Sequence, residues 1–441
     1  MYEPDYDTDM QLEDGPLDQL YERGWLLDAE DREEYRPGGY HPVHIGDSLG
    51  TAGRFRVMHK LGRGGCATVW LCRDQAPETE SKSRYVAVKI IMADESRDTS
   101  SELWLANRGG LDFGEAGGEC IAVPREHFWL DGPNGRHLCL VLSVLGPRVS
   151  ALWFTFKDPA RVSRDIALQL TRGLHFLHKN GICHGDFRPS NILLRLTGFD
   201  NLSEQELTDL LGEATKEPLV TISGESPAPS GPEYLVESLN LDLLPARFIS
   251  DQISIIDFGE SYDMHSPLAD LGITASFRSP ELLFDNTIGV GCDLWALACT
   301  IYEVRTNSPL FENFMDDDDE VIMQMVPMLG KLPEPWWSSW KARGRWYDES
   351  ATPLINPETG RPYMLTDTLE ELLSEGDNSS SLPSGDNNVK GKRNKAGGFV
   401  VGIEESRVLG GLLRGILKYD LGERMSVEAV LQHAWFKEWV R

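Results

Sequence analysis

Three oxygen-bearing side chains stand at spacings that suit the transfer of a phosphoryl group. Asp186 and Asn191 place an acid and an amide in a D-x-x-x-x-N pattern, and Asp257 opens an Asp-Phe-Gly triplet further along the chain. A carboxylate can accept the proton of an attacking hydroxyl, and carboxylate and amide oxygens are ligands that Mg²⁺ prefers. We therefore predict that Asp186 is the catalytic base and that Asn191 and Asp257 bind Mg²⁺ against the phosphates of ATP.

A glycine-rich loop precedes these residues and suits phosphate binding. Residues 61–69 read Leu-Gly-Arg-Gly-Gly-Cys-Ala-Thr-Val between two strand-like runs. Gly62 and Gly64 let the backbone approach phosphate oxygens, because no side chain stands in the way, and Ala67 is a small third residue. A glycine-rich turn alone would more often be a plain hairpin. This one lies ahead of a strand that carries a lysine, so we predict that it contacts the phosphates of ATP.

Lys89 lies inside the apolar run formed by residues 85–91. An unpaired ammonium among apolar neighbours is unfavourable, so Lys89 needs an anionic partner. We predict that its partners are the α- and β-phosphates of ATP and Glu102 on the following helix. Glu95 and Glu115 are also within range, and a lysine at a strand edge that faces solvent is the structural alternative.

Arg188 is the third candidate catalytic residue, beside Asp186 and Lys89. It follows Asp186 by two positions, where a cation can neutralise the γ-phosphate. A basic residue there indicates serine or threonine substrates rather than tyrosine. We expect His184 to be structural, because Asp186 already fills the role of the base.

Strands must carry the glycine-rich loop, and a helix must deliver the chain to Asp186. Residues 54–92 alternate in polarity between connections rich in Gly, Pro and charge, which predicts an antiparallel meander. A helix with one apolar stripe from Val162 to Leu177 is expected to end at Gly181. Further helices are predicted over residues 289–305, 319–330, 405–418 and 426–433. The fold class is therefore α+β, with strands first and helices after about residue 150.

Two contacts are expected to hold the catalytic segments in place. Glu281, which closes the segment that Asp257 opens, should form a buried ion pair with Arg424. Asp293 should begin a central helix and cap the backbone of the catalytic loop. Both roles are architectural.

The composition limits the partners of this chain. Its 441 residues include 70 acids against 42 bases, a net charge of −28, which disfavours binding to nucleic acid or anionic membranes. Solubility alone would also explain this charge. No apolar run approaches the roughly 20 residues that span a bilayer. The 7 cysteines are scattered without a C-x-x-C pair, which indicates free thiols and no zinc site. We expect a cytoplasmic monomer without nucleic-acid or membrane partners, and the basic residues 390–395 leave a nuclear location open.

The order and residues of these motifs resemble the eukaryotic protein kinases from about residue 54 to 438. Four segments resemble the SR-protein kinases in particular: residues 38–43, 61–71, 144–146 and 328–333. A long insert before Asp257 is also typical of that family. The resemblance implies a bilobal protein kinase fold, with an antiparallel β-rich N-lobe and a mainly helical C-lobe.

The resemblance also implies domain boundaries and a set of nucleotide-binding residues. The expected parts are an acidic N-terminal extension at 1–46, an N-lobe at 47–146, and a C-lobe at 147–441 with inserts at about 196–250 and 366–400. The extension is expected to be a mobile tail or to lie on the folded body. A short helix is expected after Ser203, and residues 374–398 are expected to be disordered. The nucleotide-binding residues implied are Leu61, Gly62, Gly64, Ala67, Val69, Ala87, Lys89, Glu102, Ser143, Leu145 and Asn191.

The family further implies protein substrates with Arg-Ser repeats, of the kind involved in mRNA splicing, held by an acidic groove. The acidic residues 316–320 lie near the position of that groove and could bind several guanidinium groups. The structural alternative is that acids are favoured at a helix N-terminus by its dipole.

Three residues depart from the usual kinase pattern. Gly185 stands where many kinases have an arginine that contacts a phosphorylated activation segment, so the resemblance implies no need for activating phosphorylation. Arg188 replaces the usual lysine, and Ala67 replaces a glycine. These departures leave open a pseudokinase that acts as a binding scaffold. A serine/threonine kinase whose substrates lack Arg-Ser repeats is a further alternative.

Overall fold

The computed structural model describes residues 19–76, 83–313, 315–363, 368–373, 399 and 401–439. They divide into two compact units. The first unit contains residues up to 97 together with 125–143 and 204–239, and the second contains 98–124, 144–203 and the residues from 240 onward. Part of the expected insert at 196–250 therefore belongs to the first unit. The lobe boundaries expected at residues 46 and 146 stay predictions.

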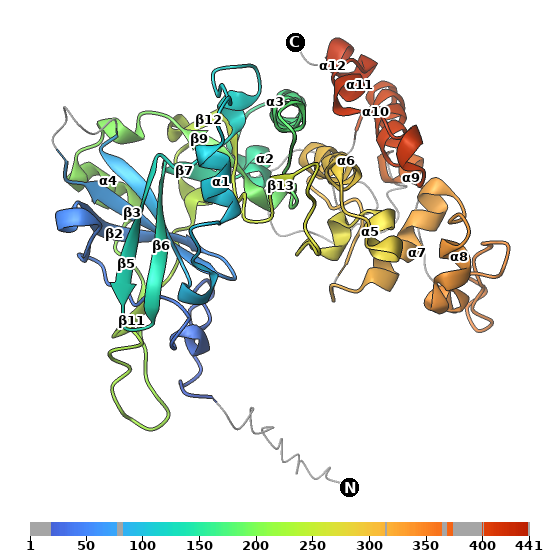
Figure 1. Ribbon diagram of the computed structural model, residues 1–441. Helices are drawn as coiled ribbons and strands as arrows, with labels where there is room; N and C mark the ends of the chain where they lie inside the picture. The colour runs from blue at the N-terminus through green and yellow to red at the C-terminus, as the bar shows by residue number, and fades with distance from the viewer. Residues whose placement is uncertain are drawn as a thin grey trace, which may run out of the picture. The chain divides into compact units, whose positions relative to one another are not determined.

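The core of the first unit is a six-stranded antiparallel sheet with the strand order β1-β2-β3-β4-β6-β5. Figure 1 labels four of its strands, β2, β3, β5 and β6. The strands are β1 (Ser48–Leu49), β2 (Phe55–Arg63), β3 (Ala67–Asp74), β4 (Tyr85–Ile91), β5 (Glu126–Gly132) and β6 (Gly135–Leu142). Apolar side chains from these strands, among them Val57, Trp70 and Val88, form one buried cluster. The antiparallel meander predicted over residues 54–92 is thus confirmed by strands β2, β3 and β4.

The described part of the N-terminal extension lies on the first unit. Tyr21, Tyr35 and Tyr40 are buried in a cluster with Leu219 and Leu235. The two leucines come from the insert, which forms helix α4 (Glu204–Leu211) and the strand pair β10 (Lys216–Pro218) and β11 (Tyr234–Val236). The extension therefore contributes to the core from residue 21 onward, as one of the two alternatives predicted, and α4 confirms the short helix expected after Ser203.

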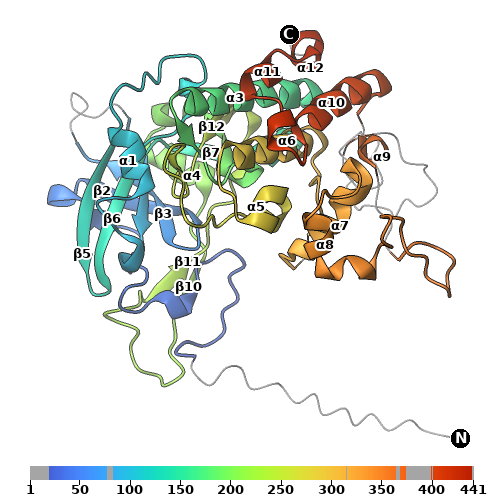
Figure 2. The same cartoon turned by 45° about the vertical axis from the view of Figure 1, so that its right-hand side comes forward.

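The second unit is mainly helical. Its longest helices are α3 (Pro159–Lys179), α6 (Val290–Thr306) and α10 (Ile403–Ile416), which Figure 2 shows side by side. Asp158 accepts a hydrogen bond from the Arg161 amide at the start of α3. Gly181, with φ of +73°, follows its end as predicted. The apolar stripe of α3 is buried, and nearly every residue of α6 is buried too, so these two helices form the core.

Shorter elements complete the second unit. The helices are α1 (Ser101–Asn107), α2 (Leu152–Thr155), α5 (Pro280–Asp285), α7 (Asp318–Leu329), α8 (Trp336–Ser339), α9 (Leu369–Leu373), α11 (Val427–Leu431) and α12 (Ala434–Trp439). The predicted helices near 289–305, 319–330, 405–418 and 426–433 correspond to α6, α7, α10 and α11. The described helices include no candidate for a membrane-spanning segment. The expected disorder at residues 374–398 and the basic segment 390–395 lie outside the described residues.

Two small antiparallel sheets position the predicted catalytic residues in the second unit. One has the order β12-β9-β7, with β12 (Ile249–Ile255), β9 (Ile192–Leu196) and β7 (Leu145–Arg148). The other pairs β13 (Tyr262–Asp263) with β8 (Ile182–Cys183). The segment that contains Asp186 runs from β8 to β9, and the segment that contains Asp257 runs from β12 to β13. Both segments are therefore held at each end by strands that pair with one another.

Candidate active site

Asp186, Arg188 and Asn191 form one hydrogen-bonded group in the second unit. Asn191 Nδ2 donates to Asp186 Oδ2 at 2.7 Å, and Arg188 Nε donates to the same oxygen at 2.9 Å. The other oxygen, Asp186 Oδ1, is buried and has no hydrogen-bond partner among the described residues. One oxygen of the carboxylate thus fixes its orientation, and the other remains able to accept a proton from a bound hydroxyl.

Asp293, at the start of α6, anchors the backbone of this loop. Its Oδ2 accepts from the His184 amide at 2.8 Å and its Oδ1 from the Gly185 amide at 3.0 Å, while His178 Nε2 lies 2.9 Å from Oδ2. Burial alone would raise the pKa of Asp293, but the hydrogen bonds from His178 and the Gly185 amide outweigh it and hold that pKa below its usual value. The predicted cap on the catalytic loop is confirmed.

Asp257 lies beside Asn191 because the two segments pair. Ile255 stands opposite Ile192 in the sheet, and the Ile256 amide donates to the Asn191 carbonyl at 2.9 Å. Asp257 follows directly and has φ of +63°, a left-handed conformation that Asp adopts more readily than most residues. The backbone pairing therefore brings together the two residues predicted to bind metal.

His184 and Gly185 connect the same two segments. The His184 ring lies 4.8 Å from the Phe258 ring, and its Nε2 is 3.2 Å from the Ile256 carbonyl oxygen. Gly185 has φ of +82°, and a Cβ built there would lie 2.1 Å from the Glu260 carbonyl oxygen. Only glycine fits this backbone, since any side chain would collide with the segment that follows Asp257.

The predicted ion pair between Glu281 and Arg424 is confirmed. Arg424 Nη1 and Nη2 donate to the two oxygens of Glu281 at 2.7 and 2.6 Å, and both side chains are buried. Arg424 Nη1 also donates to the Gly291 carbonyl, next to the start of α6. The end of the segment opened by Asp257 is thus fixed to the last helices.

Glu303, in the last turns of α6, is a neighbour of this site that sequence reasoning missed. Burial raises the pKa of its carboxyl to about 7, against the opposing effect of the Arg188 charge. A glutamate among the mostly apolar residues of α6 was the signal available, but helical spacing alone does not show that it approaches Arg188.

The predicted phosphate loop lies in the first unit, at the turn between β2 and β3. The Gly64 amide donates to the Ala67 carbonyl at 2.8 Å and closes the turn. No described atom lies within 4 Å of a Cβ built on Gly62 or Gly65, so this side of the loop is open. Because glycine has no side chain, a triphosphate could approach the backbone of the loop at these positions. The loop is therefore compatible with ATP binding.

Several predicted nucleotide-binding residues lie on adjacent strands of this sheet. Lys89 stands in the middle of β4, opposite Val69 on β3 and Leu140 on β6. Gly62 stands opposite Val69, and Ala87 follows the same face of β4 two residues before Lys89. Leu61 precedes Gly62 on β2, and Ser143, which follows β6, accepts a hydrogen bond from Arg125 Nη2.

The remaining predicted residues belong to the second unit. Glu102 is buried on α1, and Leu145 opens β7 opposite Arg195. Lys89 and Glu102 thus lie in different units. The pairing of these two residues, and a nucleotide site built from both units, stay predictions.

The acidic residues 316–320 lie around the start of α7, and several have partners within the second unit. Asp318 accepts from Arg278 Nη1 at 2.6 Å, and Asp316 is 3.8 Å from Arg278 Nη2. Asp317 caps the helix by accepting from the Asp319 amide. The structural alternative of helix capping is therefore correct for Asp317, while its neighbours form ion pairs.

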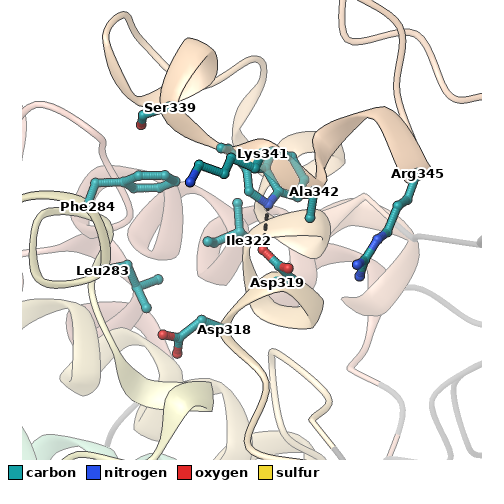
Figure 3. A pocket seen from close by; sticks show the side chains of 10 residues that line it. Leu283, Phe284, Asp318, Asp319, Ile322, Ser339, Lys341, Ala342 and Arg345 are labelled. Atoms are coloured by element: carbon teal, nitrogen blue, oxygen red, sulfur yellow. Dashed lines mark hydrogen bonds between the residues drawn. The ribbon is translucent and has the colours of Figure 1, made fainter.

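A pocket of about 570 Å³ lies beside this acidic segment (Figure 3). It is lined by residues of α5, α7, α8 and the turn after α8, including Asp318, Asp319, Lys341 and Arg345. Asp319 accepts a hydrogen bond from Trp340 Nε1 at 2.8 Å, shown by the dashed line. The pocket thus combines carboxylates, cations and an aromatic wall, with both aspartates already hydrogen-bonded through one oxygen.

Comparisons with known proteins agree with this geometry. Residues 241–436 match the family described as "Protein kinase domain". "Serine/threonine-protein kinase SRPK" of Physarum polycephalum is 26% identical over 370 residues, which cover 79% of this chain and 84% of the relative. "Protein kinase dsk1" of Schizosaccharomyces pombe is 27% identical over 394 residues, covering 69% of this chain and 71% of the relative. Human "SRSF protein kinase 3" is 36% identical over 176 residues, or 38% of this chain and 30% of the relative.

The domain match and the similarity to these kinases together support a protein kinase that resembles the SR-protein kinases. The chain is an ATP-dependent serine/threonine protein kinase, and among such kinases it resembles the SR-protein kinases.

Proposed function

We propose that this kinase transfers the γ-phosphoryl group of ATP with Asp186 as the residue that orients and deprotonates the substrate hydroxyl. The observation that carries this role is the buried Asp186 Oδ1, which has no hydrogen-bond partner among the described residues. The carboxylate is oriented through Oδ2 by Asn191 and Arg188, so Oδ1 can accept the hydroxyl proton without a change of rotamer.

Asn191 and Asp257 are the residues that would hold Mg²⁺, and the glycine-rich loop with Lys89 would hold the phosphates. Protein kinases in general use both ATP and Mg²⁺, and the bound metal would neutralise phosphate charge during transfer. The adjacency of Asn191 to Asp257 and the open side of Gly62 and Gly65 support these assignments.

Lys89→Met and Asp257→Ala test this site. Both variants should fold but lose Mg²⁺-dependent transfer by roughly 100-fold or more, because each removes charge that stabilises the transferring group. Lys179→Met is the matched control, since Lys179 is an exposed lysine on α3 that pairs with Glu115. Full activity of Lys89→Met would refute the phosphate role. ATP binding without any turnover by the wild-type chain would instead support a binding scaffold.

We further propose that the substrates are Arg-Ser-rich proteins of mRNA splicing. Support comes from the resemblance to kinases whose names include SRPK and SRSF protein kinase. The net charge of −28 and the acidic start of α7 add electrostatic support. Asp318 binds Arg278 through Oδ1, and a carboxylate can accept further donors on its other oxygen.

Peptide kinetics separate this substrate class from neutral serine substrates. An Arg-Ser peptide should have a lower KM than a neutral serine peptide at low salt, and the difference should shrink at 1 M salt, where the Debye length falls to about 3 Å. Asp317→Asn with Glu320→Gln should raise the KM of the Arg-Ser peptide alone. The matched control is Glu213→Gln with Glu225→Gln, which removes the same charge from exposed positions of the first unit. Equal KM values for both peptides at low salt would exclude docking by acids.

A further inference from the structure

The hydroxyl of Tyr40, in the N-terminal extension, contacts the backbone of the glycine-rich loop. Tyr40 Oη lies 3.0 Å from the Gly64 carbonyl oxygen and 3.1 Å from the Gly65 carbonyl oxygen. A phenol has one proton, which these two acceptors share. Burial raises the pKa of the Tyr40 phenol above its usual value, so the group stays protonated and can donate at neutral pH.

The position of Tyr40 is itself fixed by backbone and side-chain contacts. The Ala93 amide donates to the Gly39 carbonyl at 3.1 Å, directly after β4, and Asn134 Nδ2 donates to the Tyr40 carbonyl at 2.6 Å. The Tyr40 ring lies 5.8 Å from the Tyr35 ring in the buried cluster of the extension. The hydroxyl therefore presents a fixed donor to the loop.

The planarity of the peptide bond gives this contact a consequence for phosphate binding. In a trans peptide the N–H points opposite to the C=O of the same unit. Because the carbonyls of Gly64 and Gly65 turn toward Tyr40, the amides of Gly65 and Cys66 turn away from it. Consecutive backbone amides that point in a common direction form a typical phosphate-binding arrangement.

We propose that Tyr40 is a positioning residue for the phosphate-binding loop, which it holds so that the Gly65 and Cys66 amides face the nucleotide phosphates. Tyr40 does not touch the nucleotide; it acts through the two carbonyls. The inference rests on the proposed function, because it assumes that the loop binds ATP. It adds a role for the N-terminal extension in the affinity for one substrate of the reaction.

Tyr40→Phe removes the hydroxyl and keeps the ring. The KM for ATP, and the Kd of a Mg²⁺-bound non-hydrolysable ATP analogue, should each rise about 2- to 10-fold, the change expected for one hydrogen bond. The KM of the peptide substrate should stay within about twofold of the wild-type value. Binding of adenosine should be unchanged, because adenosine has no phosphate to meet the two amides.

Tyr21→Phe is the matched control. Tyr21 lies in the same buried cluster, and its hydroxyl is 3.4 Å from a backbone carbonyl oxygen, that of Tyr35, which is outside the loop. This variant should leave the Kd of the ATP analogue unchanged. If both variants lower the melting temperature equally and neither weakens the ATP analogue, Tyr40 is merely structural and the inference is overturned.

The two hypotheses fail in different ways. If the wild-type chain binds adenosine and the ATP analogue equally well, or binds neither, the assignment of the loop to phosphates is wrong and the role of Tyr40 is wrong with it. If the wild-type chain prefers the ATP analogue and Tyr40→Phe keeps that preference, only the role of Tyr40 is refuted.

Discussion

The catalytic loop and the glycine-rich loop are held in place by opposite kinds of contact. In the second unit, the buried carboxylate of Asp293 accepts two backbone amides and lies within hydrogen-bond distance of His178. In the first unit, the neutral hydroxyl of Tyr40 shares one proton between two carbonyls. Hydrogen bonds to a charged group are about twice as strong as neutral ones. We infer that the catalytic loop is held rigidly, while the phosphate loop is held by a contact weak enough to break.

The largest effect is expected for Asp293→Asn. The amide side chain keeps one acceptor and places an NH₂ group against backbone amides that need an acceptor. The free energy of unfolding should fall by about 3–5 kcal/mol, as for a buried charge network that is broken, and phosphoryl transfer should fall more steeply than stability. Urea unfolding and single-turnover kinetics measure the two quantities.

Asp165→Asn is the control for that variant. Asp165, also an acid of the second unit, forms an i,i+4 pair with Arg161 on the surface of α3. Its loss should cost about 0.5 kcal/mol or less. If Asp293→Asn lowered the free energy of unfolding by no more than this, the charged contact at Asp293 would not be stronger than the neutral contact at Tyr40.

The next effect is expected for Glu281→Gln, which leaves the buried Arg424 guanidinium without an anion. The free energy of unfolding should fall by about 3 kcal/mol, because removing one partner of a buried pair strands the other charge. Replacing both partners by Glu281→Leu and Arg424→Met should recover much of that loss in urea unfolding. If the double variant had a lower free energy of unfolding than Glu281→Gln alone, the ion pair itself would stabilise the segment, and the unpaired charge would not explain the loss.

Glu303 is a partly buried acid, and its ionised form should oppose folding. Its pKa is raised to about 7 from an ordinary value near 4.5, so the stability that it contributes is complete below pH 4.5 and is lost as pH rises through 7. Glu303→Gln mimics the protonated form and should flatten this pH dependence. At pH 8 the variant should exceed the wild type by up to roughly 3 kcal/mol in urea unfolding. A wild-type profile equally flat between pH 4.5 and 7 would contradict the raised pKa.

The smallest effect is expected for Asp28→Asn in the first unit. Asp28 pairs with Arg63 Nε at 3.0 Å beside the glycine-rich loop, but both side chains are exposed. Its removal should cost about 0.2–1 kcal/mol or less and change the KM for ATP by less than about twofold. If Asp28→Asn raised the KM for ATP more than Tyr40→Phe does, the ion pair rather than the Tyr40 hydroxyl would be the main contact that holds the loop.

Local patterns predicted the elements well. The strands of the first sheet and helices α3, α6, α7 and α10 follow from the spacing of apolar residues in the sequence. These apolar residues are buried in the core of the unit to which each element belongs. The cap by Asp293 and the Glu281–Arg424 pair were also predicted, since buried charges need partners and the motif order supplied the candidates.

Other features had no local signal. Tyr40 was seen only as part of a family-like segment, because its contact depends on how residues 38–40 pair with the chain after β4. The insert residues 204–239 join the first unit although they follow the catalytic loop in sequence. Glu303 approaches Arg188 through the packing of α6, which helical spacing does not reveal. Each of these three features depends on packing between residues far apart in the chain. A single sequence carries little information about such contacts.

The Gly185 position has a consequence for the control of this enzyme. A Cβ there would lie 2.1 Å from the Glu260 carbonyl oxygen, so an arginine could enter only if the backbone after Asp257 moved. An engineer who wished to install a phosphate-responsive switch by restoring that arginine would have to rebuild the neighbouring segment as well. The glycine thus makes an arginine at this position difficult to install by one substitution.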